Sequence, residues 1–338
     1  MRARWEDLAT RARGLATHLL GRVELDALAR TPDLAALGDA LRARGFLPGE
    51  GPATPETLEL AVRRIAATRL GVLAAWGRDR NALLAVIFED EDRRSLRALL
   101  RGAVRGAATH ERLAGLIPTP GLPERALAEL AGQPTPNAVA VLLTAWGSAY
   151  GPALLPDAAA ARPDLLRLEY RLNALFASRA LRGARAAKSR GLIEFVRETI
   201  DLENACTALV LAGAELDAPP QQAFVDGGRR LSLAAFSDAV AAPDAGAAAR
   251  RLATAFASDP IADAFARAAD DPAAIEEALL RQRIAVLDVA VRRNPAGPAS
   301  VLHYVLRLRA EVLDLRRVIW GVMLRAPRAD IAAALVSV

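Results

Sequence analysis

The sequence contains few of the side chains that most often carry out chemistry. Among its 338 residues there are one cysteine, Cys206, and three histidines, and Lys188 is the only lysine. A single cysteine excludes a disulfide within the chain and any structural zinc site built on cysteines. Aromatic residues make up only 4% of the chain. This composition argues against an enzyme, and it predicts no cofactor, no metal site and no small-molecule substrate.

Neither a large excess of charge nor a long apolar run is present. The 44 basic and 39 acidic residues leave a formal net charge of +5, which is modest for a nucleic-acid-binding protein of this length. The longest uncharged stretch, residues 130–156, is interrupted by four prolines and lacks the roughly 20 consecutive apolar residues of a membrane span. Charges occur throughout the first fourteen residues, unlike in a secretory signal. We expect a cytoplasmic protein that is at most peripheral to a membrane.

Apolar residues recur at helical spacing along the whole chain. Leu96, Leu99 and Leu100 share one helix face, and residues 301–322 carry a single apolar stripe over about six turns. Hydrophobic residues make up 53% of the sequence, enough for a large core. Proline and glycine breaks separate the helical segments at 118–121, 219–220, 227–228 and 295–298. The chain is therefore predicted to be all-α.

A loose internal repeat has a period of about 110 residues. Three helical segments carry an acid followed three positions later by a polar or acidic residue: Asp92 and Ser95, Asp201 and Asn204, and Glu311 and Asp314. Pro32, Pro136 and Pro243, at similar intervals, each precede a helix-like run. We expect three similar helical bundles with approximate boundaries at 1–115, 116–229 and 230–338. Residues i and i+3 lie on one helix face, so each polar pair is expected to bond a neighbouring helix or loop.

Several segments resemble the C subunit of V/A-type ATPases, whose vacuolar counterpart is the d subunit. Residues 190–232 match through the Asp201 and Asn204 pair on a long helix, followed by Phe224 and a Gly-Gly turn. The C-terminal residues 297–336 resemble the last long helix of that family and its short tail. Residues 95–102 and the N-terminal helix, with Arg11 and Arg13, are also similar. The asparagine of the family motif is replaced by Ser95 in the first repeat and by Asp314 in the third.

The resemblance implies a fold, a function and a set of partners. The fold would be three helical bundles arranged as a funnel. The function would be that of a non-catalytic central-rotor subunit of a rotary ATPase or ATP synthase, which transmits torque for ion transport. Its partners would be the central stalk subunits and the proteolipid rotor ring, on the cytoplasmic side of the membrane.

A basic stripe is the best candidate for contact with those partners. It consists of Arg179, Arg182, Arg185, Lys188 and Arg190, and its first three members lie along one side of a helix. Such a stripe would attract acidic surfaces on a stalk or ring. The alternative is that these residues form an ordinary solvent-exposed helix face with no partner. The acidic run 89–92 is expected to begin the helix over 95–102, where negative charge suits the helix dipole. The four tryptophans, Trp5, Trp76, Trp146 and Trp320, are expected to pack in the core or between helices, with one exposed at the stalk socket as the alternative.

Two other functions remain open from the residues alone. The first is an arginine-rich, all-α nucleic-acid-binding or regulatory adaptor, which the modest net charge disfavours. The second is a helical enzyme with a carboxylate site, for which Glu198, Asp201 and Glu203 form the densest acidic cluster. The spacing of these acids turns Glu203 away from the other two.

Overall fold

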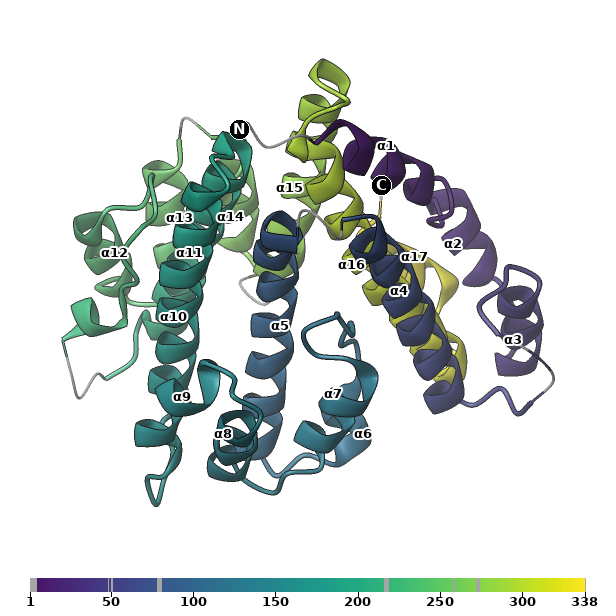
Figure 1. The fold of residues 1–338 in the computed structure, drawn as a ribbon, viewed down its shortest axis with the longest axis horizontal. Helices are drawn as coiled ribbons and strands as arrows, with labels where there is room; N and C mark the ends of the chain where they lie inside the picture. Colours follow the sequence, from purple (N-terminus) through teal and green to yellow (C-terminus); the bar gives the residue numbers. More distant parts are fainter. Residues whose placement is uncertain are drawn as a thin grey trace. The chain divides into compact units, whose positions relative to one another are not determined.

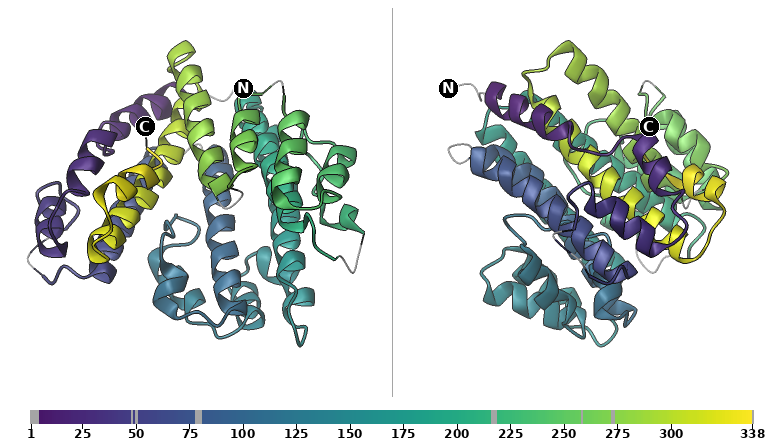
Figure 2. Two further views of the ribbon diagram at one scale, coloured as in Figure 1. Left: turned by 180° about the vertical axis from the view of Figure 1, so that it is seen from behind. Right: turned by 90° about the vertical axis from the view of Figure 1, so that its right-hand side faces the viewer.

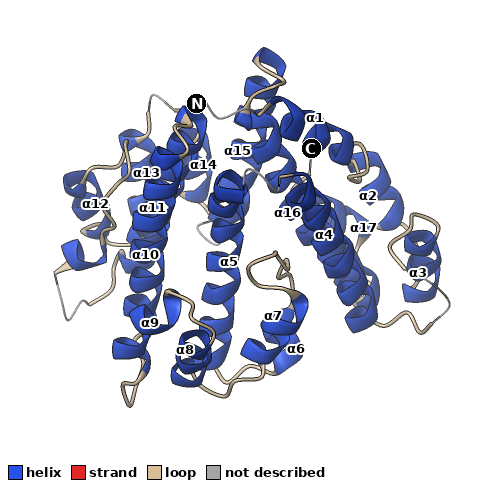
Figure 3. Ribbon diagram, viewed as in Figure 1, coloured by secondary structure: helices blue, strands red, loops and turns tan. Residues whose placement is uncertain are grey.

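The computed structural model describes residues 5–47, 49, 51–77, 81–215, 219–257, 259–271 and 274–337. Over these residues the chain forms seventeen α-helices and a short 3-10 helix, and no strand is present among them (Figure 3). The prediction of an all-α protein is confirmed. No helix of the described part is both long and apolar enough to cross a bilayer.

Residue contacts divide the chain into two compact units, each made of segments that are separate in sequence. Among the described residues, unit 1 holds 81–107 and 132–286, and unit 2 holds 5–77, 108–131 and 287–337. Compactness and internal similarity are different properties, so the three repeats remain a prediction from the sequence.

Unit 1 is built around three long helices that lie side by side (Figure 1). Its elements are α5 (Asn81–Val104), α8 (Pro136–Ala145), α9 (Tyr150–Ala158), α10 (Leu165–Ala186), α11 (Arg190–Leu211), the 3-10 helix η2 (Pro220–Ala223), α12 (Leu233–Val240), α13 (Ala245–Ala255), α14 (Ala262–Ala268) and the first part of α15 (Ile275–Arg293). Helix α10 packs against α5, α9 and α11, and α11 packs against α12 and α13. The apolar core under α11 to α14 includes a stacked pair of buried rings, Phe256 and Phe265, with centroids 5.2 Å apart.

Unit 2 surrounds one central helix, α16 (Pro298–Met323) (Figure 2). Its other elements are α1 (Glu6–Ala16), α2 (Arg22–Leu28), α3 (Leu34–Arg42), α4 (Pro55–Trp76), α6 (Thr109–Leu113), α7 (Glu124–Ala131), α17 (Arg328–Ala334) and the last part of α15. Helix α16 contacts α1, α2, α3, α4 and α17. It is buried around most of its circumference, as expected of a helix that packs on several sides.

The helix starts explain why the spaced prolines recur. A polar residue next to each proline caps the following helix: Asp33 caps α3, Thr135 caps α8 and Asp244 caps α13. Each side chain accepts the backbone N–H three positions on, over 2.9, 3.2 and 2.7 Å. An N-cap satisfies an N–H that has no partner within the helix. The prolines at 32, 136 and 243 therefore mark helix starts, each together with a neighbouring N-cap residue.

One local expectation is wrong, and the tryptophans differ among themselves. The acidic run 89–92 lies in the middle of α5, which begins at Asn81, so the helix dipole does not explain it. Its acids meet cations instead, as described below. Trp5 lies in the core as expected, whereas Trp76 and Trp146 are 56% and 40% exposed, which is the alternative considered for a tryptophan at a partner surface. The ring of Trp76 lies 5.0 Å from the guanidinium of Arg11.

Candidate partner-binding surface and buried polar networks

The basic stripe occupies the end of the α10–α11 hairpin in unit 1. Arg179, Arg182 and Arg185 lie in the last two turns of α10, Lys188 lies in the turn, and Arg190 is the first residue of α11. All five side chains are exposed. The structure thus brings the predicted residues together at one end of a helical hairpin.

The members of the stripe differ in whether an acid already neutralises them. Arg179 forms an ion pair with Glu89 of α5, and Arg190 pairs with Glu194 over 2.9 Å. Within the described part of the chain, Arg182, Arg185 and Lys188 have no ion pair. These three cations are therefore available to an acidic partner.

The polar pair on α11, Asp201 and Asn204, binds the backbone of the loop before α12. The buried Asp201 carboxylate accepts N–H groups of Arg229, Arg230 and Leu231 over 2.9–3.1 Å. The Asn204 amide donates to the Val225 carbonyl over 2.8 Å and accepts the Val225 N–H over 2.9 Å. These bonds satisfy backbone groups that would otherwise be buried without partners.

The Gly-Gly turn permits this arrangement. A Cβ at Gly228 would lie only 2.0 Å from Oδ1 of Asp201, and Gly227 has a φ of +113°. Only glycine leaves room for the carboxylate at one position and adopts that backbone angle easily at the other. Burial raises the pKa of Asp201, although the three N–H groups oppose the shift.

The third polar pair has a related arrangement on α16. The Asp314 carboxylate accepts the N–H groups of Val336 and Ser337 over 2.6 and 2.8 Å. Glu311 accepts the Leu20 N–H over 2.8 Å and forms an ion pair with Arg69. The first pair, Asp92 and Ser95, lies on α5, where Ser95 is buried and Asp92 is half-buried.

Unit 1 also contains a buried ionic network that the sequence did not reveal. The Arg93 side chain has no exposed surface. It donates to Asp90 and Glu203, each over 2.8 Å, and to Asn173 over 2.6 Å. Its guanidinium lies 4.9 Å from the ring centroid of Phe176. Arg93 thereby connects α5 to both α10 and α11.

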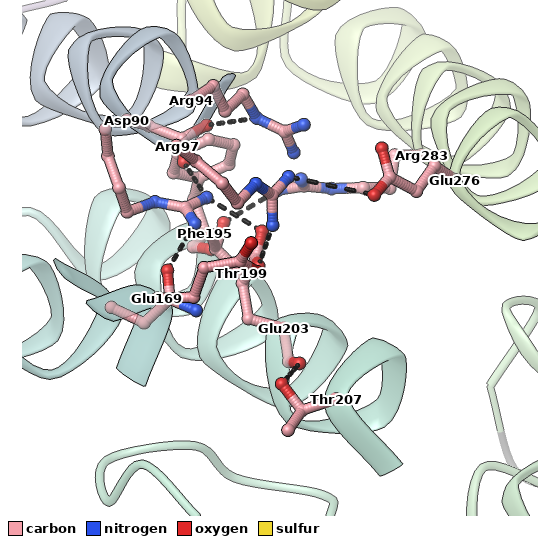
Figure 4. A network of polar contacts seen from close by, with 12 residues as sticks. Asp90, Arg94, Arg97, Glu169, Phe195, Thr199, Glu203, Thr207, Glu276 and Arg283 are labelled. Carbon is pink, nitrogen blue, oxygen red and sulfur yellow. Dashed lines mark hydrogen bonds and ion pairs between the residues drawn. The ribbon is translucent and has the colours of Figure 1, made fainter. Parts of the chain in front are cut away.

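The network extends to α15 through two further arginines (Figure 4). Arg97 of α5 donates to Glu203 over 2.6 Å and lies 3.8 Å from Glu276 of α15. Arg283 of α15 is buried, donates to Thr199 over 3.1 Å and lies 4.8 Å from the Phe195 ring. Four helices of unit 1 are thus joined by charged or polar side chains.

The charges of this network stabilise one another. Burial alone would raise the pKa of Glu203, but Arg93 and Arg97 outweigh it and hold the pKa well below its ordinary value. Burial likewise opposes the charge on Arg93, and Glu203 with Asp90 more than compensates, so its pKa is raised. Both groups therefore remain ionised.

The three acids considered for an enzyme site are held by different partners. Asp201 binds backbone amides, Glu203 binds arginines, and Glu198 lies 3.6 Å from Arg283. The arrangement fits structural roles for all three acids. In the described part, no group of three or more His, Cys, Asp or Glu side chains is placed to hold a metal ion.

Comparison with known proteins identifies the family. No curated protein matches the chain closely. A model of the family described as ATP synthase (C/AC39) subunit matches residues 8–334, nearly the whole sequence. The resemblance noted from the motifs is confirmed, and the matched range includes most of both units. This chain belongs to the ATP synthase (C/AC39) subunit family, which comprises the C and d subunits of V/A-type ATPases.

Proposed function

We propose that this chain is a non-catalytic central-rotor subunit of a V/A-type ATPase or ATP synthase. It links the central stalk to the membrane proteolipid ring and transmits torque between ATP chemistry and ion transport. It acts on the cytoplasmic side of the membrane as a peripheral subunit. The observation that carries this proposal is the family match over residues 8–334.

The buried contacts of unit 1 are suited to a rigid subunit that transmits force. A subunit that transmits torque needs stiffness rather than reacting groups. The Arg93 and Arg97 contacts tie α5 to α10 and α11 through short, charge-assisted hydrogen bonds, which are stronger than neutral ones. Shearing these helices past one another would expose or separate buried charges, which is costly.

We also propose that the chain consists of three repeats, with approximate boundaries at 1–115, 116–229 and 230–338, in a funnel arrangement. The polar pairs of α11 and α16 support the repeat. Asn204 bonds the backbone 21 positions downstream, and Asp314 bonds the backbone 22 positions downstream. The caps at Asp33, Thr135 and Asp244 recur at a similar period.

Capture of the intact complex tests the proposal. The chain would be tagged in its source organism, membranes would be extracted with a mild detergent, and the proteins captured with the tag would be identified. We expect the catalytic head, the central stalk and the proteolipid ring. Recovery of the chain alone, or with nuclease-sensitive nucleic acid, would refute the rotor function and favour the adaptor.

A functional assay adds the torque-transmitting role. Membranes from cells that lack the chain would be assayed for ATP hydrolysis and for ATP-driven ion uptake into vesicles, with and without the purified chain. We expect the chain to restore ion uptake. Uptake that is equally strong without the chain would contradict a coupling role.

A further inference from the structure

Five helix ends of this protein share a turn in which one residue adopts the left-handed conformation. The N–H of that residue bonds the carbonyl three positions back, and the next N–H bonds the carbonyl five positions back. This closure occurs at five helix ends: Gly45, Gly106, Gly147, Lys188 and Arg325. It is a Schellman motif, whose left-handed position favours glycine because any Cβ is strained there.

Two of these five ends keep a basic residue where glycine would fit best. Lys188 has a φ of 51° and Arg325 a φ of 54°, and they are the two residues other than glycine with positive φ in the described part. Strain of this kind persists when something other than backbone preference retains the residue. At Lys188 the chain keeps its only lysine.

The turn at Lys188 is also the tightest of its kind. Ala187 is the C-cap of α10, and Ser189 already caps α11 by accepting the N–H of Leu192. Lys188 alone therefore reverses the chain between two 22-residue helices. Its side chain is exposed at the tip and has no ion pair with any described residue.

Lys188 differs from Arg325 in its surroundings. Arg182 and Arg185 lie in the last two turns before Lys188, and neither has an acidic partner among the described residues. The last arginines before Arg325 are engaged, because Arg316 pairs with Glu59 and Arg317 donates to the Ala334 carbonyl. Unpaired positive charge is therefore greater at the α10–α11 end, where three cations lie within seven residues, than at the end of α16, where only the exposed Arg325 and Arg328 lack an ion pair among the described residues.

We propose that the α10–α11 end, defined by Arg182, Arg185 and Lys188, docks onto a carboxylate-bearing surface of a neighbouring subunit in the rotary complex. The proposal rests on the proposed function and names the chemistry of the partner. Guanidinium groups bind carboxylates in a two-pronged geometry, and an ammonium group adds a compact point charge. Lys188 is retained in a strained turn because it contacts that surface.

The neighbouring side chains favour a protein partner over a membrane surface. Segments that insert into a bilayer interface combine basic residues with exposed tryptophan, phenylalanine or leucine. Residues 182–191 have no large exposed apolar side chain. Exposed Ala186 and half-buried Ala187 and Gly191 flank the cations, so another backbone can approach closely.

The decisive variant is Lys188→Gly, because a structural role and a docking role predict opposite results. Glycine relieves the left-handed strain, so the urea midpoint of the isolated chain should stay the same or rise. Binding of the labelled chain to membranes that carry the rest of the complex should weaken about 3-fold, which is typical for one exposed charge pair. Lys188→Arg keeps the charge and should bind like the wild type.

Charge reversal enlarges the effect. The triple change of Arg182, Arg185 and Lys188 to glutamate should weaken binding on the order of 100-fold, because like charges that face each other are strongly unfavourable. The matched control reverses three other exposed arginines of unit 1 that have no ion pair in the described part, Arg162, Arg250 and Arg267. It should bind like the wild type. Arg325→Gly relieves the same strain elsewhere and should also leave binding unchanged.

The outcomes separate the two proposals. If the wild-type chain does not bind membranes that carry the complex, the proposed function fails. If the wild type binds, but the Lys188→Gly and triple variants bind equally well, the rotor function stands and the docking surface is refuted. The last measurement is binding of the same variants to vesicles of anionic phospholipid that contain no protein. If they bind the wild type as tightly and the triple variant loses that binding, the partner is lipid and the proposal is overturned.

Discussion

Helices α11 and α16 each carry a polar pair at i and i+3, but the second member of each pair binds different backbone groups. In α11, Asn204 faces both the carbonyl and the N–H of Val225, and an amide can accept and donate at once. In α16, Asp314 faces two N–H groups, those of Val336 and Ser337, and a carboxylate only accepts. The residue type therefore follows the backbone groups that the neighbouring segment presents.

The first members of the two pairs differ in where their bonding partners lie. Asp201 binds the loop that follows its own helix, whereas Glu311 reaches back to Leu20 near the N-terminus. In both of these pairs the second member binds a backbone segment 21 or 22 positions downstream. The first position is used for whatever lies beside it in each unit.

The largest loss of stability is expected from breaking the buried ionic network around Arg93, which includes Glu203 of α11. Helix α16 has no comparable network among the described residues. Arg93→Met would leave Asp90 and Glu203 buried without their main partner. Losing one member of a buried ionic cluster typically costs about 3–5 kcal/mol of unfolding free energy. Urea denaturation followed by circular dichroism would measure the loss.

A matched control uses an exposed arginine of the same unit. Arg171 is 45% exposed and pairs with Asp157 over 2.9 Å. Arg171→Met should cost less than about 1 kcal/mol, as is usual for surface ion pairs. Equal losses in the two variants would show that burial does not determine the value of these contacts.

The next largest effect should come from giving α11 the side chain of α16. Asn204→Asp removes the donor that satisfies the Val225 carbonyl and places a carboxylate against it. An unsatisfied buried polar group costs about 1–3 kcal/mol. Urea denaturation gives the total, and hydrogen exchange should show faster exchange in residues 225–231. Unchanged exchange there would contradict the assignment.

Acidic pH should act in opposite directions on the contributions of Glu203 in α11 and Glu311 in α16. The pKa of Glu203 is lowered by its arginines, so its contribution to stability is full above the ordinary glutamate value of 4.5 and is lost as the pH falls. Burial raises the pKa of Glu311 despite Arg69, so its contribution is full below 4.5 and is lost as the pH rises. Hydrogen exchange, corrected for intrinsic rates, should show α11 losing protection in acid before α16. Glu203→Gln should remove the acid sensitivity of α11, and a loss that persists in this variant would point to another group.

Much of the fold could be predicted from local pattern alone. The spacing of Leu96, Leu99 and Leu100 indicates a helix, and the Asp201 and Asn204 spacing puts both side chains on one face. These signals are local because helix periodicity and capping act within a few residues. The motif residues also revealed the family.

The buried network could not be predicted because its contacts are distant in sequence. Arg93 and Glu203 are 110 positions apart. The sequence around each of them looks the same as it would around an exposed arginine or glutamate. The role of the acidic run at 89–92 is hidden for the same reason: its partners, Arg179 for Glu89 and Arg93 for Asp90, come close only when the helices pack. The strain at Lys188 was also hidden, since a lysine between two helices gives no sign of its φ.

The smallest effect should come from the reverse exchange, Asp314→Asn. The amide oxygen can still accept the buried Val336 N–H, while the Ser337 N–H, in a half-buried residue near the end of the chain, can turn toward water. Asp314 also lies 3.7 Å from Arg317, but the Arg317 side chain is 23% exposed and keeps its bond to the Ala334 carbonyl, so the lost ion pair adds little. We therefore expect a loss of about 1 kcal/mol, mainly the net value of one hydrogen bond. The two exchanges thus have unequal costs because α11 presents a carbonyl that only a donor can satisfy, whereas α16 presents N–H groups that an amide can partly satisfy. If Asp314→Asn costs more than Asn204→Asp in urea denaturation, then bonding partners do not determine the residue at this position.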